Sequence, residues 1–338
     1  MAVPEEILGL DLTVAILVVA LVVVVLLACW GVRSAFPKED DMFRRFPSCG
    51  RAHLPGLKET VATPYHNYSS DTLLIHGWAD AAAVKSRLPA GFHPVTNAKT
   101  GRAICTFWVV NYRKTTVGPY KELVVVYVVA DEPGVTITCG SVHCVNVINT
   151  RPGVRQYIDK LWLDEALPIE YGRHLLGCDK HKGSVMQVDR TGDTLDFKFV
   201  DEREGDELLS GSLDVPESFF GHYVAHLPFL VWEMGLTKAT FFVINPSEFI
   251  RWAATGPPGV GAGLAPAVPL DASPLWGAVF VTDPRFTWHK RGDILKVGKR
   301  FEFLKFEPAL YQHDRRLKAV LLGAWGHKRH DGAVADAV

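Results

Sequence analysis

The segment from Lys121 to Asp131, KELVVVYVVAD, constrains the fold of this chain more than any other. Its apolar core leaves no polar face, which is typical of a strand that is buried on both sides. Such a strand must lie inside a sheet whose two faces are both covered. We therefore expect a β-rich domain built around this segment.

The rest of the chain has many strand patterns and few helical ones. A short helix is predicted over 81–92, where Pro89 and Gly91 end it, and the 3.6-residue period of 153–166 predicts a second helix. This pattern predicts a mostly β (α+β) domain over 63–325, shaped as a cone, barrel or sandwich. The other predicted strands are 72–80, 104–113, 135–149, 194–202, 239–245, 276–283 and 300–310.

The N-terminal region differs from this domain because residues 12–32 contain no charged side chain. The run is long enough to cross a bilayer as a helix, which predicts a transmembrane anchor over 1–33. A cleaved signal peptide fits less well, because the region before the run lacks basic residues. A polar linker is expected over 34–62, and a flexible tail over 326–338.

The charges around the span predict its orientation. Lys and Arg are absent before residue 12, whereas five occur between Arg33 and Arg51. The positive-inside rule therefore predicts a single-pass membrane protein with its main domain in the cytosol. The acceptor triplet Asn67-Tyr68-Ser69 points the other way, since glycosylation marks a lumenal or extracellular loop. The six scattered cysteines fit a reducing compartment.

Composition and motifs give no indication of a nucleic-acid, metal or cofactor site. The chain has 36 Lys and Arg against 37 Asp and Glu, so no basic surface for nucleic acid is expected. Cys139, His143 and Cys144 do not have the spacing of a zinc site. The segment 256–263 lacks the lysine of a phosphate-binding loop. The long Gly/Pro/Ala stretch over 255–274 is either a lid or a linker.

Glu122 is the first candidate for chemistry. On an extended strand it shares a face with Tyr120, Val124 and Val126, and such apolar surroundings disfavour an ionised carboxylate and suit proton transfer. The alternative is an ordinary residue at a strand end, paired with a surface lysine.

Lys180 is the second candidate, in the sequence YGRHLLGCDKHKG at 171–183. A lysine becomes a nucleophile when it is desolvated or lies beside another cation. On a strand Lys182 and Cys178 would share its face, so Lys182 could supply that cation, whereas Asp179 would oppose the effect. A solvated basic turn is the alternative reading of the same residues.

These segments resemble the acetoacetate decarboxylase family. The likeness extends from about 63 to 312 and includes TPYHN and LLIHGWAD, VKSRLPAGF, GPYKE as G-x-Y-x-E, and YGRHLLGCDKHKG as G-R-E-x(4)-P-K-K-x-G. It implies an antiparallel β cone, often oligomeric, with a closed apolar pocket. It also implies that Lys180 forms a Schiff base, that Glu122 is the pocket carboxylate, and that no cofactor is needed.

The chain departs from the family pattern at four positions. His181 replaces the second lysine, Asp179 the proline before the nucleophile, and His174 the glutamate after G-R. The family's substrate-handling arginine falls at or next to Trp78. The expected pocket therefore includes Tyr120, Trp78, His181 and Lys182.

The function that follows is a membrane-anchored, decarboxylase-like enzyme that acts through Lys180 on an apolar β-keto acid or a related carbonyl compound. Its expected partners are that small molecule, the membrane through residues 12–32, and further copies of the chain. Two alternatives remain on the same fold: a Schiff-base aldolase, dehydratase or cyclase, and a non-catalytic module that binds an apolar small molecule. A purely structural membrane protein is a third.

Overall fold

The computed structural model describes most of the predicted β domain. The described residues are 43, 47–48, 50–54, 57, 60–137, 154–176, 178–214, 249–255, 275–281, 285–289 and 292–325. The predicted anchor, the tail, the strand 239–245 and the Cys139–Cys144 segment lie outside them. In the part of the chain that is described, no helix has the length and apolar character needed to span a bilayer. The anchor and its orientation stay predictions.

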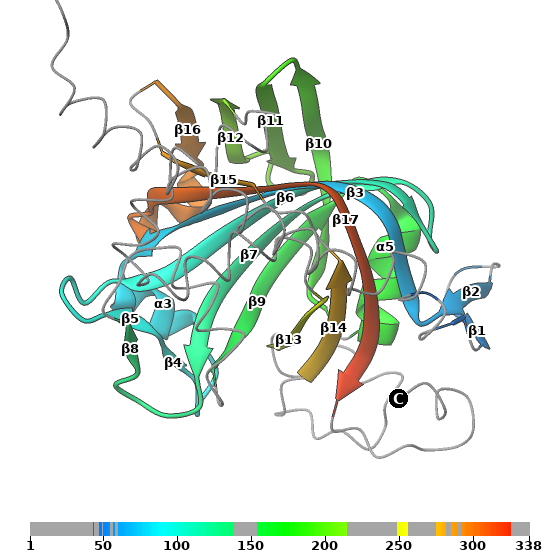
Figure 1. The fold of residues 1–338 in the computed structure, drawn as a ribbon, viewed down its shortest axis with the longest axis horizontal. Helices are drawn as coiled ribbons and strands as arrows, with labels where there is room; N and C mark the ends of the chain where they lie inside the picture. Colours follow the sequence, from blue (N-terminus) through cyan, green and yellow to red (C-terminus); the bar gives the residue numbers. More distant parts are fainter. Residues whose placement is uncertain are drawn as a thin grey trace, which may run out of the picture.

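A strongly curved sheet of 15 strands forms the body of the molecule (Figure 1). Its order is β16-β12-β11-β10-β9-β13-β14-β17-β3-β6-β5-β8, and β7 pairs with both β6 and β9. The long central strands are β3 (Tyr65–Ala79), β6 (Ala103–Thr115), β7 (Tyr120–Ala130), β9 (Val154–Leu163) and β17 (Glu307–Trp325). The others are β4 (His93–Pro94), β5 (Thr96–Asn97), β8 (Thr136–Ile137), β10 (Lys180–Thr191), β11 (Thr194–Asp201), β12 (Glu207–Asp214), β13 (Phe249–Thr255), β14 (Leu275–Val281), β15 (Arg285–Trp288) and β16 (Ile294–Val297).

Strand β7 lies at the centre of this sheet, as its sequence predicts. Every residue from Glu122 to Ala130 is buried. Leu123, Val125 and Tyr127 belong to one apolar cluster, whereas Val124 and Val126 belong to a second cluster on the other face. The second face is the one that carries Glu122, so the functional candidate points into an apolar layer.

The predicted cone or barrel is confirmed only as a mostly β, curved sheet, and no regular closed barrel is seen among the described strands. Strand β7 pairs with β9 along its length. By contrast, β13 meets β9 only where Ala254 pairs with Gln156 and Thr255 with Tyr157. This two-residue contact joins β13 to β9 without the long ladder of hydrogen bonds that joins β7 to β9.

Strands β10, β11, β12 and β16 extend beyond the body as a separate antiparallel lobe, at the top of Figure 1. Strand β10 links the two parts. Its first residues, from Lys180 to Lys182, pair in parallel with Leu161–Leu163 of β9 in the body. Its remainder pairs with β11 in the lobe. Lys180 therefore lies at the junction of the lobe and the body.

Several elements differ from the sequence-based expectation. The segment 153–166 was predicted as a helix but forms β9, because the exposed edge of β7 takes it up as a strand buried on both faces. The start of 300–310 forms a 3-10 helix, η2 (Lys299–Leu304), before β17. The linker contains a small hairpin, β1 (Gly50–His53) and β2 (Thr60–Thr63). The short helix α3 (Ala81–Arg87) is confirmed, with Asp80 capping its start.

Candidate active site

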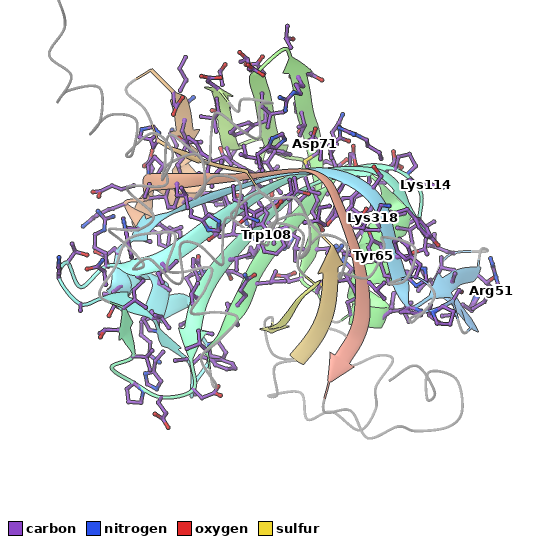
Figure 2. The ribbon with its side chains drawn as sticks, in the orientation of Figure 1. Arg51, Tyr65, Asp71, Trp108, Lys114 and Lys318 are labelled. Atoms are coloured by element: carbon purple, nitrogen blue, oxygen red, sulfur yellow. The ribbon has the colours of Figure 1, made fainter. Side chains whose placement is uncertain are left out.

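An apolar cavity of about 90 Å³ lies on the face of the sheet that carries Glu122. That volume is several times what one water molecule needs, so the cavity has room for a small organic molecule. Strands β3, β6, β7, β9 and β17 contribute to its walls. In Figure 2 the lining residue Trp108 lies below the arch of β17, and Tyr65 lies beside the descending part of that strand. The described lining residues are Tyr65, Asn67, Thr72, Trp108, Val110, Tyr112, Tyr120, Glu122, Val124, Ile158, Leu161, Pro168, Tyr171, Leu176, Cys178, Lys180, Leu317, Ala319 and Leu321.

Lys180 and Glu122 meet in this cavity. Lys180 Nζ lies 3.0 Å from Glu122 Oε1, and the two side chains are 6% and 4% exposed. The sequence separates them by 58 residues, and the sheet brings them together because β9 pairs with β7 on one side and β10 on the other. A buried pair of opposite charges is costly to desolvate, so it is a candidate for chemistry as well as for structure.

The turn before β10 determines where the Lys180 side chain lies. After β9 the chain forms the helix α5 (Ala166–Tyr171) and a π-helical turn, η1 (Gly172–Leu176). A Cβ atom on Gly172 would lie 2.1 Å from Lys180 Cε and 2.9 Å from its Nζ. The lysine side chain thus occupies the space that any other residue at 172 would fill. Single π-helical turns are frequent at functional sites.

Arg173 fixes the same turn to the start of β10. Its Nε and Nη2 atoms donate hydrogen bonds to the Lys180 carbonyl oxygen at 3.0 and 2.6 Å. Its Nη1 lies 3.1 Å from Glu170 Oε1. The fork-shaped guanidinium therefore holds the backbone of Lys180 from outside the cavity.

Three tyrosines form a phenol cluster beside the ion pair. Tyr65 and Tyr120 share a hydrogen bond of 2.7 Å between their hydroxyl groups, and Tyr112 stacks on Tyr120 with ring centroids 4.3 Å apart. Burial raises the pKa of all three phenols well above its ordinary value, and the charge of Glu122 adds to the effect at Tyr112. The three phenols are therefore protonated at neutral pH.

Cys178 lines the cavity but is not suited to nucleophilic attack. Burial raises the pKa of its thiol to about 12. The reactive form of cysteine is the thiolate, which is scarce at neutral pH when the pKa is so high. Lys180 thus remains the candidate nucleophile among the lining residues that the structure describes.

The structure places His181 and Lys182 outside the lining, which corrects the predicted pocket. Lys182 is half exposed and lies 3.3 Å from Glu202. His181 packs against Trp162 and lies 3.1 Å from Asp179. Residues 180–182 still pair with β9 in the body of the sheet, but the ammonium group of Lys182 is paired with Glu202 outside the lining. Lys182 therefore does not supply a cation beside Lys180. Asp179 faces His181 and Lys160, and His181 is the main cause of its lowered pKa.

Trp78 is also absent from the lining. It lies at the far end of β3, where it pairs with Glu307 and Ile104, and packs in a separate small apolar cluster. Residues nearer the start of the same strand, Tyr65, Asn67 and Thr72, take the place expected for it. Asn67 is fully buried and donates to Ser70 and to the Leu317 carbonyl, so it is not available as a glycosylation site.

Sequence reasoning placed Lys180, Glu122 and Tyr120 in one pocket, and the structure brings these three together. It did not identify Tyr65, Tyr112, Trp108 or Gly172 as site residues. The alternation of β6 could have indicated Trp108 and Tyr112, since they point to one face together with Val110. No local signal links Gly172 to Lys180, because their contact depends on the turn between them.

Comparison with known proteins agrees with the resemblance seen in the sequence. Residues 53–218, just under half of the chain, match the family model described as Acetoacetate decarboxylase (ADC). No curated protein matches the chain.

Solved structures with a similar arrangement share little sequence with the chain. One is acetoacetate decarboxylase from Legionella pneumophila, at 12% identity and a TM-score of 0.47, covering 78% of this chain and 88% of that one. Another is the enduracididine biosynthesis enzyme MppR complexed with pyruvate, at 14% identity and a TM-score of 0.46, covering 80% and 92%.

Proposed function

On the premise that residues 53–218 match the acetoacetate decarboxylase family model, we propose that this protein is an enzyme that binds a carbonyl compound as a Schiff base on Lys180. The observation that carries the proposal is the buried pair of Lys180 and Glu122, 3.0 Å apart in an apolar cavity. A lysine in such a place is desolvated, accessible to a ligand in the cavity, and next to a proton acceptor.

The ion pair can generate the nucleophile without a base from outside. If the ammonium group of Lys180 passes a proton to the carboxylate of Glu122, the products are a free amine and a carboxylic acid. The amine then adds to the carbonyl carbon, and the Glu122 acid can protonate the departing oxygen, which leaves as water.

The resulting iminium withdraws electrons from the neighbouring carbon. That carbon can lose carbon dioxide from a β-keto acid or lose a proton, and both routes give an enamine. Decarboxylation is the reaction that the family resemblance implies; aldol, dehydration or cyclisation chemistry would use the same enamine. The membrane anchor at residues 12–32 would keep such an enzyme close to apolar metabolites, and assembly into a homo-oligomer would agree with the resemblance.

Reductive trapping tests the proposal. Full-length protein is incubated with acetone, a small ketone without a carboxylate, at pH 7, reduced with borohydride, and digested for peptide mass analysis. We expect the adduct on Lys180, and none in Lys180→Ala. Lys182→Ala is the matched control, because it removes a half-exposed lysine from the same strand and should leave the labelling unchanged.

The alternative is a non-catalytic module that binds an apolar small molecule in the same cavity. Labelling spread over the surface lysines, with Lys180 no more reactive than the others, would reject the Schiff-base mechanism and favour this alternative.

A further inference from the structure

The charge balance of the cavity bears on which carbonyl compounds it can accept. Among the lining residues that the structure describes, Lys180 and Glu122 are the only ones with a formal charge. They already form an ion pair, so the described wall is neutral overall. A ligand that carries a carboxylate would bring in a negative charge that this wall does not balance.

Three cations on the segments around Lys180, namely η1, β9 and β10, are already held by other groups. Arg173 binds Glu170 and the Lys180 carbonyl oxygen. Lys182 pairs with Glu202, and Lys160 lies 3.6 Å from Asp179. If one of these cations moved to a ligand, its present ion pair would break and the carboxylate partner would lose its counter-charge.

The other polar side chains of the described lining carry no charge. Asn67 and Thr72 are among them, and the amide of Asn67 is already used by Ser70, Ser69 and the Leu317 carbonyl. The phenol pair of Tyr65 and Tyr120 can donate to a neutral oxygen. The remaining lining is mostly aliphatic or aromatic, which suits the carbon chain of an apolar ligand.

From this balance we infer that the substrate is a small, largely apolar ketone or aldehyde without a free carboxylate, and that its iminium on Lys180 loses a proton rather than carbon dioxide. The inference rests on the Schiff base proposed above. In this step the electron pair of the α-carbon–hydrogen bond forms a carbon–carbon double bond, the π pair of the carbon–nitrogen double bond moves to nitrogen, and the proton passes to the Glu122 carboxylate, which leaves a neutral enamine. Its return from Glu122 regenerates the iminium, so the cycle needs no further reactant.

Two matched ketones test the inference on full-length protein. 2-Hexanone and levulinate (4-oxopentanoate) are both methyl ketones of similar length, but only levulinate carries a carboxylate. Trapping with borohydride measures the rate of adduct formation on Lys180. Proton NMR in D2O measures the exchange of α-hydrogens, with Lys180→Ala as the control for exchange that does not involve this lysine.

We expect 2-hexanone to label Lys180 at least ten times faster than levulinate, and to exchange its α-hydrogens only when Lys180 is present. Equal or faster labelling by levulinate would overturn the neutral-substrate inference while leaving the Schiff base in place. Failure of both ketones to label Lys180 above other lysines would reject the Schiff base together with the inference.

Discussion

At the scale of single residues, the position of the candidate nucleophile depends on a missing side chain. Lys180 extends along Gly172, and its amino group reaches Glu122 only because no Cβ lies in the way. A Cβ atom at position 172 would meet the flexible end of the Lys180 side chain at short distance. A small side chain there should therefore displace the amine without unfolding the turn. Gly172 is therefore a positioning residue.

Gly172→Ala is expected to lower the rate of borohydride trapping at Lys180 at least tenfold, while the unfolding midpoint in urea changes little. Gly292→Ala is the control, because a Cβ there would contact nothing within 4 Å. Unchanged trapping in Gly172→Ala would show that the amine keeps its position despite the added methyl group.

The ion pair of Lys180 and Glu122 should also affect stability, because removing one partner is expected to cost more than removing both. Lys180→Met leaves Glu122 buried without its partner and should reduce the free energy of unfolding by about 3 to 5 kcal/mol, whereas Lys180→Met combined with Glu122→Leu should recover most of the loss. Urea unfolding measures both. The exposed pair Lys182 and Glu202 is the control, with an expected effect below about 1 kcal/mol. A double variant no more stable than the single one would contradict this account.

At the scale of elements, the site depends on how three segments meet. Strand β9 lies between β7 and β10, so Glu122 and Lys180 face the same cavity. The turn η1 closes over them, and Arg173 joins this turn to β10 through two hydrogen bonds to one carbonyl. The hydrogen bonds from the Arg173 side chain to the backbone of Lys180 therefore maintain this junction, together with packing.

Arg173→Lys tests this junction. A lysine keeps the charge but cannot donate two parallel hydrogen bonds, so the start of β10 should become more mobile. We expect trapping at Lys180 to fall several-fold and hydrogen exchange of the amides in 178–182 to rise. Arg203→Lys, in an exposed turn, should change neither. Faster exchange with full trapping would mean that the junction does not position the nucleophile.

At the scale of the whole molecule, burial of ionisable groups makes stability depend on pH. His76, on β3, is buried, and its Nδ1 contacts the Thr106 hydroxyl at 3.0 Å. Burial lowers the pKa of this imidazole from 6.5 to about 4. Between these values the unfolded chain binds a proton that the folded protein excludes, so the free energy of unfolding falls as the pH is lowered.

The loss should reach about 3 kcal/mol between pH 6.5 and 4. In His76→Gln this contribution is absent, so the curve of unfolding free energy against pH should be flatter than in the wild type by that amount. Urea unfolding at a series of pH values measures the difference, and all other titrating groups are common to both proteins. Parallel curves for the two proteins would show that His76 takes up its proton equally in the folded and the unfolded chain.

The meeting of Lys180, Glu122 and Tyr120 in one pocket was expected only from the family resemblance, since Lys180 and Glu122 are 58 residues apart in the chain. The residues by themselves determined the mostly β class and the central place of β7. These conclusions rest on local information, because a short apolar run indicates a buried strand whichever other segments pack against it. Helix α3 belongs with them, because its cap at Asp80 and its end before Pro89 are local signals.

Only the tertiary structure decided the rest. The segment 153–166 has a helical period, but the open edge of β7 makes it a strand, because backbone hydrogen bonds and burial on both faces outweigh local preference. Trp78 and Lys182 leave the site because the strands that carry them run past it. Gly172 and the phenols of Tyr65 and Tyr112 enter it, since the contacts that define a cavity join residues far apart in the chain.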